Sequence, residues 1–268
     1  FNLHAIYHLM AEKMPAWKDL DLASLGVRYI YPHVVAAFPF KDGSSLIFTR
    51  DPQETAESIA QFSKADAAAY LHMWEEFQPM LDDFLIPMTY ELPKPALDQL
   101  SEFGETEVGA KLAEISEMSC LEVIDHYGFQ HPRVRMALLS FPAIWGIHLA
   151  DPLGFLYPLY LCRMMDAAFV KGGSHRLSSA IYRSFVRSGG QVIDENEVTK
   201  ILTENNRVQG VQLQDGRKFF ADAVISTLNP VQTFKHLLTK EEVPFALSQC
   251  VDTWQWEERS LFGLHLGI

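Results

Sequence analysis

The sequence is poor in cysteine. Its 268 residues hold three, Cys120, Cys162 and Cys250, and none belongs to a C-x-x-C pair. Cysteines so few and so widely spaced argue against a disulfide framework and against a zinc site, and they fit a reducing compartment. Histidine supplies no substitute: His4 and His8 share one predicted helix face, but the H-E-x-x-H pattern is absent and no third ligand is evident. We therefore expect no metal site.

Basic residues are also in deficit, since 22 Lys and Arg stand against 34 Asp and Glu, a net charge of −12. A nucleic-acid-binding surface needs clustered Lys and Arg, so no such partner is expected. Long apolar runs are absent too: the least charged stretch, residues 136–162, is interrupted by Pro, Gly and Asp, and charged residues interrupt residues 1–14. We expect neither a transmembrane segment nor a secretory signal. The acidic charge and the few cysteines favour a cytoplasmic protein.

The first part of the chain combines a few strands with many helix signals. Residues 28–32, 36–40 and 45–49 have the β-rich composition of strands, whereas residues 1–14 carry apolar side chains at helical spacing. Beyond residue 50 the sequence predicts several helix starts in succession. Each start has a side chain that can cap free N–H groups or a proline that suits the first helical turn. These starts are at Asp51 with Pro52, Ser63, Ser119 with Glu122, and Pro132, and Pro79 is expected to kink a helix.

Residues 143–160 are dense in large apolar and aromatic side chains set among Pro and Gly. Such a segment either fills a core or lines an apolar pocket, and the sequence leaves both alternatives open. In a pocket, histidine and tyrosine would be among the few polar groups able to orient a substrate. The candidate pocket residues are Trp145, His148, Leu153, Phe155, Tyr157 and Tyr160.

Within residues 170–230 the spacing of the apolar side chains changes from that of a helix to that of strands. Ser174 is a candidate cap for a helix with the apolar stripe Leu177, Ile181 and Phe185, and the glycine pair after residue 188 should end it. Short β-rich runs follow, separated by Asn-Asn and Asp-Gly turns, at residues 191–194, 198–203, 207–213, 218–220 and 223–227. The pattern predicts a helix followed by a β-meander.

This series resembles the FAD-dependent oxidoreductases of the phytoene desaturase type, which include carotenoid and retinoid desaturases and saturases. The matching residues, in order, are Lys171-Gly172-Gly173 with Arg176-Leu177, Gly189-Gly190-Gln191-Val192, Glu197-Val198 with Ile201, Arg207-Val208-Gln209-Gly210-Val211, Asp215-Gly216, Ala221-Asp222-Ala223-Val224-Ile225-Ser226, and Asn229-Pro230. The resemblance implies that the chain returns here to a flavin domain. It places the backbone of Val198 at the adenine end of FAD, with Gly172, Gly173, Ser226 and Thr227 along the cofactor cleft.

The pyrophosphate-binding loop of that family is missing, because none of the 15 glycines forms G-x-G-x-x-G. The resemblance therefore implies only the middle of an α+β or α/β FAD-dependent oxidoreductase fold. We expect a helical-plus-sheet substrate domain at residues 1–169, the second segment of the FAD domain at 170–238, and a truncated return to the substrate domain at 239–268, including a strand at 260–268. Without the loop, this chain is expected to bind FAD weakly or not at all and to be inactive.

By resemblance, the whole protein would transfer a hydride between flavin and a hydrophobic, polyunsaturated or isoprenoid substrate. No catalytic residue is assignable. The alternatives are an amine-oxidase-like flavoenzyme and a flavin-free interaction domain that keeps the fold. A lipid-resident substrate is compatible with peripheral membrane contact, and the oligomeric state does not follow from the sequence.

Overall fold

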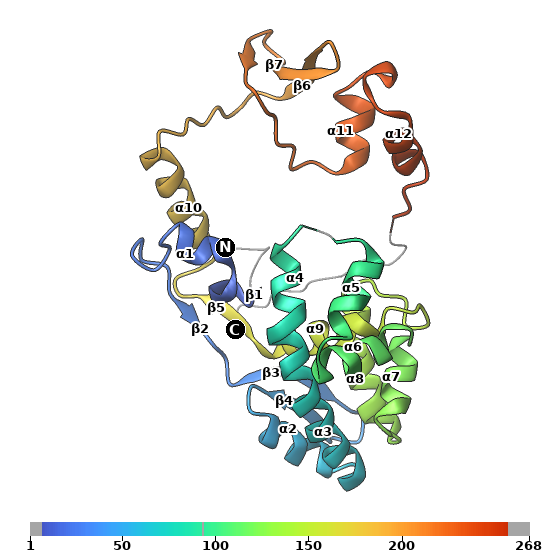
Figure 1. Cartoon of the computed structure of the whole chain (residues 1–268). Coiled ribbons are helices and arrows are strands. Elements are labelled where there is room, and N and C mark those ends of the chain that lie inside the picture. The colour runs from blue at the N-terminus through green and yellow to red at the C-terminus, as the bar shows by residue number, and fades with distance from the viewer. Residues whose placement is uncertain (1–6, 93, 257–268) are drawn as a thin grey trace. The chain divides into compact units, whose positions relative to one another are not determined.

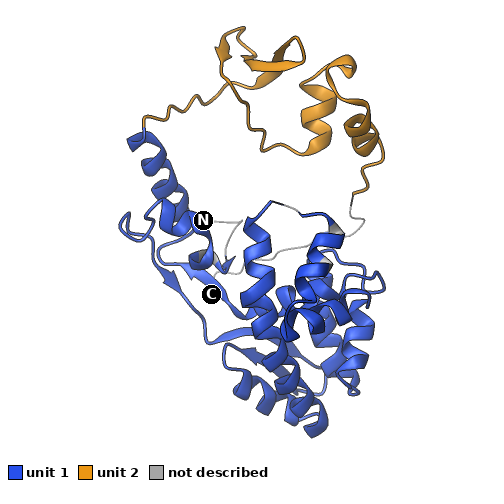
Figure 2. Ribbon diagram, viewed as in Figure 1, with its two compact units in different colours: residues 1–188, 261–268 blue, residues 189–260 orange. Residues whose placement is uncertain are grey.

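A computed structural model describes residues 7–92 and 94–256 of the chain. The chain divides into two compact units, residues 1–188 with 261–268 as unit 1 and residues 189–260 as unit 2 (Figure 2). The predicted assignment of residues to a substrate domain and a FAD domain stays a prediction, and the strand predicted at residues 260–268 lies outside the described residues.

Among its described residues, unit 1 contains two small antiparallel sheets. In the first, β5 (Ala167–Val170) lies between β1 (Tyr7–Leu9) and β2 (Tyr29–Ile30), and in the second β3 (Val34–Pro39) pairs with β4 (Ser45–Thr49). The strands predicted between residues 28 and 49 are thereby confirmed. The helix predicted over residues 1–14 is wrong where it is described: residues 7–9 are a strand, because Tyr7 pairs with Phe169.

The helices of unit 1 occupy most of the chain between residues 50 and 190 (Figure 1). They are α1 (Pro15–Asp19), α2 (Pro52–Ala60), α3 (Lys64–Met80), α4 (Ile86–Tyr90), α5 (Ala96–Phe103), α6 (Glu107–Ser116), α7 (Cys120–His126), α8 (Pro132–Ile144), α9 (Tyr157–Met165) and α10 (His175–Arg187), with short 3-10 turns at Ala11–Lys13 and Gly154–Leu156. A π turn, Leu81–Leu85, follows Pro79 directly, where the sequence predicted a kink.

The helix starts predicted at Asp51, Ser63 and Ser119 are confirmed by side-chain capping bonds, and the start predicted at Pro132 is confirmed by α8 without such a bond. The Asp51 carboxylate accepts from the Gln53 N–H at 2.8 Å, and Ser119 and Glu122 form a complete capping box. Asp66 does more than support its own helix, because its buried carboxylate also accepts the His131 N–H at 2.9 Å. This bond ties the start of α3 to the start of α8.

The core of unit 1 is rich in aromatic side chains packed edge to face. Phe48 and Phe141 lie with ring centroids 5.0 Å apart, and Phe77 and Tyr157 lie 5.8 Å apart, with all four side chains buried. These contacts join β4 to α8 and α3 to α9. Offset and edge-to-face pairs add to the stabilisation that apolar burial provides, so the hairpin and the helices form one packed body.

Glu76, in the middle of α3, joins this helix to two further segments of unit 1. Its carboxylate accepts from Lys111 Nζ on α6 and from the Tyr127 hydroxyl after α7, each at 2.8 Å, and its side chain is 18% exposed. Burial would raise the pKa of Glu76, but these hydrogen bonds outweigh it and hold the pKa below its usual range. A group whose pKa is lower in the folded state stabilises the fold above its unfolded-state pKa, and this stabilisation is lost as pH falls through the folded-state pKa.

We expect Glu76→Gln to lower the free energy of unfolding at neutral pH by about 1–3 kcal/mol, because the charge-assisted bonds to Lys111 and Tyr127 weaken. The difference from the wild type should shrink as the pH is lowered into the acid range, where Glu76 itself becomes protonated. Urea unfolding at several pH values measures it. Glu75→Gln, on the exposed side of the same helix, is the control, and an equal loss in both variants would contradict the prediction.

Unit 2 begins with the predicted meander. Strands β6 (Val198–Glu204), β7 (Arg207–Leu213) and β8 (Lys218–Phe220) are antiparallel, and the turn residues Asn205, Asn206 and Gly216 all have positive φ, as their sequence predicts. Residues 191–194 and 223–227, also predicted as strands, pair with no strand among the described residues.

Two helices complete unit 2, α11 (Pro230–His236) and α12 (Phe245–Asp252), with a 3-10 turn at Lys240–Glu242 between them. The Asn229 side chain caps α11 by accepting the Gln232 N–H at 2.8 Å. The end of α11 is fixed to the meander, because the Ile201 N–H donates to the Leu237 carbonyl at 2.9 Å. In neither unit does the described part of the chain contain a helix that combines the length and the apolarity needed to cross a bilayer.

Candidate cofactor site

Gly172 and Gly173 form the turn between β5 and α10 in unit 1. Their φ angles are +85° and +98°, a region that residues with a side chain rarely adopt, so the turn requires glycine. The Gly173 N–H donates to the Val170 carbonyl at 2.9 Å and closes the turn. A Cβ at Gly172 would meet only the flexible Arg176 side chain, at 3.3 Å. The backbone of this turn is therefore bare enough for a ligand to approach closely.

The helix predicted after this turn is confirmed as α10, and it ends at Arg187, shortly before Gly189, whose positive φ stops the helix as expected. Ser174 occupies the N-cap position, but its side chain makes no capping bond, because its backbone is helical and not extended. The apolar stripe predicted on α10 is packed only at its start: Leu177 packs against the small core cluster that contains the buried Ala180, whereas Ile181 and Phe185 are exposed.

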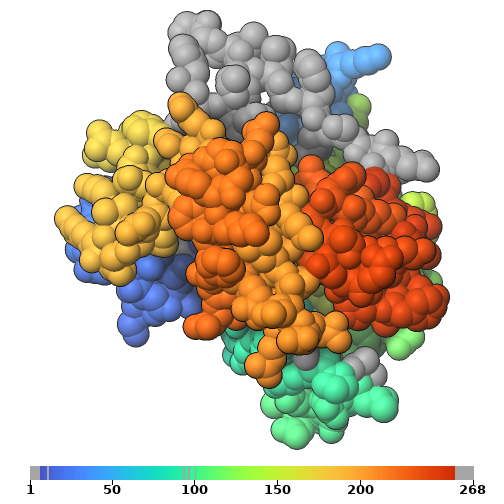
Figure 3. Space-filling view, turned by 90° about the horizontal axis from the view of Figure 1, so that it is seen from above, coloured from blue at the N-terminus to red at the C-terminus, as the bar shows by residue number. Residues whose placement is uncertain are grey.

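Three of the five predicted cofactor residues lie together in unit 2. Val198, Ser226 and Thr227 line one cavity of about 620 Å³ between the meander, residues 224–228 and α11. Figure 3 shows one face of this unit, with the orange meander beside the red helical segment. The other two predicted residues, Gly172 and Gly173, lie in unit 1. The structure thus places three of the five predicted cofactor residues around one cavity and the other two in a turn.

The wall of this cavity is mostly apolar. Ile201, Val211, Val224 and Ile225 contribute aliphatic side chains, and Glu197, Gln232 and His236 are polar groups that line it. Such a lining, with a few polar groups, suits a flat aromatic ring held by its edges. The sequence did not single out Gln232 and His236, although the Asn229-Pro230 helix start places both on the helix that borders the cavity.

Ser226 has a structural role in the cavity wall. Its hydroxyl lies 2.8 Å from the Thr233 hydroxyl on α11 and accepts from the Leu228 N–H at 3.3 Å. These bonds hold residues 226–228 against the first turn of α11. Thr227 is exposed beside it, so its backbone and hydroxyl are accessible from the cavity.

The six candidate substrate-pocket residues divide between the core and the surface of unit 1. Tyr157 is fully buried, its hydroxyl has no hydrogen-bond partner among the described residues, and burial raises its pKa well above the usual value. His148 is largely exposed and lies 3.4 Å from the Asp151 carboxylate. Leu153 and Phe155 pack at the edge of the core.

Trp145 and Tyr160 remain together near the surface of unit 1. Their ring centroids lie 5.9 Å apart, and the Arg163 guanidinium lies 6.0 Å from the Trp145 ring. Burial raises the pKa of Tyr160, so its hydroxyl stays protonated and can donate a hydrogen bond. Of the six residues, this pair best suits contact with a ligand. Among the described residues, no three His, Cys, Asp or Glu side chains are gathered as metal ligands.

Comparison with known proteins relates this chain to flavoenzymes. The family model described as flavin containing amine oxidoreductase matches residues 35–251. The chain is 35% identical to a limonene dehydrogenase subunit of Castellaniella defragrans, over 100% of this chain and 51% of that protein. It is 32% identical to a lycopene-forming phytoene desaturase of Pseudescherichia vulneris, over 85% of this chain and 45% of that protein. It therefore spans about half the length of these relatives.

A solved structure shares the fold. The chain superposes on an oxidoreductase from Methanosarcina mazei with a TM-score of 0.57 and 18% identity, over 94% of this chain and 53% of that one. At this identity the likeness concerns the fold alone. It agrees with a partial FAD-dependent oxidoreductase fold of mixed helices and small sheets.

Proposed function

Because this chain belongs to the family of flavin-containing amine oxidoreductases, and within it resembles the phytoene desaturase type, we propose that the whole protein is an FAD-dependent dehydrogenase or desaturase. Its substrate in this proposal is a hydrophobic, unsaturated isoprenoid hydrocarbon. Two relatives support this class, since their names specify limonene and phytoene. The observation that carries the proposal is the cavity of unit 2, which gathers three residues that the family resemblance assigns to the cofactor.

FAD, when bound, would supply the two-electron chemistry as a hydride transfer. This chain would contribute residues that hold the cofactor in place. In unit 2, the backbone of Val198 would face the adenine end of FAD, and Ser226 and Thr227, which line the same cavity, would lie along the cofactor. A hydrocarbon offers no polar group to bind, so its site must exclude water and position the reacting C–H bond by shape.

The 268 residues alone are proposed to bind FAD weakly and to lack turnover, because they contain no glycine-rich pyrophosphate loop. The whole protein is proposed to carry that loop elsewhere in its sequence. An amine substrate is the alternative that the family description suggests. The two substrate classes differ in a measurable way, because an amine oxidase would reduce its flavin with amines and leave it oxidised with a hydrocarbon.

An anaerobic flavin titration of the whole protein tests the proposed function. We expect the purified protein to retain a visible flavin absorption band, and limonene to bleach it where benzylamine does not. A colourless protein that takes up no added FAD would refute the cofactor assignment. Bleaching by the amine alone would refute the hydrocarbon class. The same spectrum on the 268-residue chain after FAD addition and desalting should show little or no band.

A further inference from the structure

A second cavity in unit 2 is separate in its lining from the candidate cofactor cavity. It measures about 230 Å³ and lies among α11, the 3-10 turn and α12. None of the residues that line it lines the cofactor cavity. They are Phe234, Lys235, Leu238, Lys240, Val243, Ser248, Val251 and Asp252.

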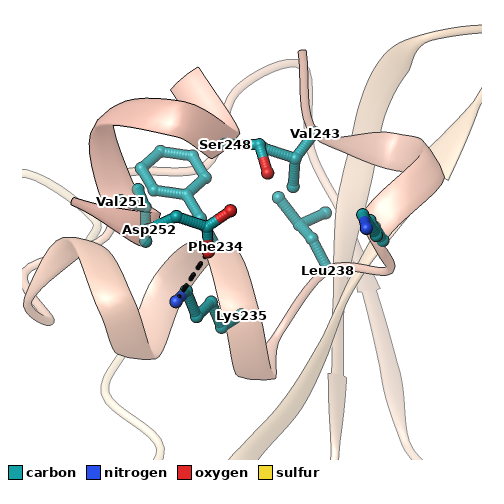
Figure 4. A pocket seen from close by; sticks show the side chains of 8 residues that line it. Phe234, Lys235, Leu238, Val243, Ser248, Val251 and Asp252 are labelled. Atoms are coloured by element: carbon teal, nitrogen blue, oxygen red, sulfur yellow. Dashed lines mark ion pairs between the residues drawn. The ribbon is translucent and has the colours of Figure 1, made fainter. Parts of the chain in front are cut away.

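The floor of this cavity is apolar. Figure 4 shows Phe234 and Val251 on one side, Leu238 and Val243 on the other, and the Ser248 hydroxyl between them. Val243 and Val251 are buried, so the floor is a fixed part of the packing between the two helices. A dry apolar cavity of about 150 Å³ is large enough for a benzene ring, so this one has room for a ring or a short branched chain.

The rim carries more positive than negative charge. Lys235 Nζ and Asp252 Oδ1 form an ion pair of 2.8 Å, drawn in Figure 4, and Lys235 lowers the pKa of Asp252 with a further contribution from Lys240. Lys240 itself forms no ion pair with any described residue. The Ser248 hydroxyl likewise has no hydrogen-bond partner in the described ranges. Among the residues that line the cavity, two lysines stand against one aspartate, and the Ser248 hydroxyl is able to donate a hydrogen bond.

From this arrangement we propose that the cavity binds a compact carboxylate with an apolar ring or a short alkyl chain. The carboxylate lies at Lys240 and the Ser248 hydroxyl, and the apolar part lies on Phe234, Leu238 and the two valines. A cationic ligand would meet the excess positive charge, and a neutral hydrocarbon would leave Lys240 and Ser248 without an acceptor. The ligand class is therefore different from the hydrocarbon proposed as substrate, and the site is independent of the flavin.

Sodium benzoate is the probe, titrated into the 268-residue chain and followed by chemical-shift changes in the ¹H–¹⁵N spectrum. We expect saturable shifts at the residues of this cavity, and binding about tenfold weaker for benzyl alcohol, which keeps the ring and loses the charge. Equal binding of the two probes, or no saturation within the solubility of benzoate, would overturn the proposal. Neither result depends on whether the protein binds FAD.

Comparison of two variants, each with one lysine neutralised, distinguishes a specific contact from general charge attraction. Lys240→Gln removes the rim charge at the cavity, and Lys218→Gln removes an exposed charge on β8 that does not line it. We expect benzoate affinity to fall about tenfold in the first variant and to stay unchanged in the second. An equal change in both variants would show non-specific attraction only. Leu238→Phe, which fills the cavity while keeping both lysines, should abolish the shifts if the apolar floor takes part.

Discussion

Ile225→Asp is expected to abolish flavin retention by the whole protein without unfolding unit 2. Ile225 lines the candidate cofactor cavity together with Val198 and Thr227, and it is 90% exposed, so its replacement removes almost no packing. A carboxylate there must lose its hydration when an aromatic ring covers it. Burial of an unpaired charge costs at least several kcal/mol, so FAD affinity should fall by about a hundredfold or more.

Phe245→Asp is the matched control, because Phe245 is a 77% exposed apolar residue of the same unit and does not line that cavity. The measurement is the ratio of flavin to protein absorbance after gel filtration, with the circular dichroism of each variant as the test of folding. Loss of flavin from both variants would indicate a general effect of the charge. Full retention in a folded Ile225→Asp protein would show that this cavity does not hold the cofactor.

The parts of the fold that the sequence predicted correctly are those fixed by neighbouring residues. Asp51 and Ser119 cap their helices through bonds to residues two or three positions away, and Asn205 and Asn206 turn the meander by their own backbone preference. When a side chain determines the structure of its immediate neighbours, the local sequence is enough to predict that structure.

The errors concern structure that depends on distant partners. Residues 7–9 form a strand because β5, about 160 residues later, offers its edge, and their own spacing fits a helix equally well. Residues 223–227 have the composition of a strand, but a strand exists only when another strand pairs with it, and none does so among the described residues. The spacing of apolar residues indicates which secondary structures a segment can form. Whether the segment forms a strand depends on a second strand that pairs with it.

The candidate site shows the same division. Family resemblance selected Val198, Ser226 and Thr227, and the fold places them around one cavity. The aromatic segment left the choice between core and pocket open, and the fold divides its residues by burial: Tyr157 is in the core, whereas Trp145 is half exposed. Burial of a particular aromatic side chain depends on which helices pack over it, and the local sequence does not contain that information.

Gly210→Ala is expected to unfold the meander that carries the cofactor cavity. Gly210 lies in β7 with φ +150°, and an added Cβ would be 1.9 Å from the Phe219 carbonyl oxygen on β8. Backbone atoms cannot move aside as a side-chain end can, so β8 must separate from β7. Because backbone strain and steric overlap act together at this residue, we expect a loss of at least about 3 kcal/mol in the stability of unit 2.

Gly216→Ala separates these two causes, because Gly216 also has positive φ, +90°, but an added Cβ would meet nothing within 4 Å. Gly216→Ala should lower the stability of unit 2 by about 1–2 kcal/mol, which is the penalty of the left-handed conformation alone. Hydrogen exchange of the β6 and β7 amides under native conditions measures both variants locally. Val198 and Val211 lie on these strands and line the cavity, so the Gly210→Ala protein should also lose its flavin. Equal protection in the two variants would show that the approach of β7 to β8 is not the constraint that selects glycine at residue 210.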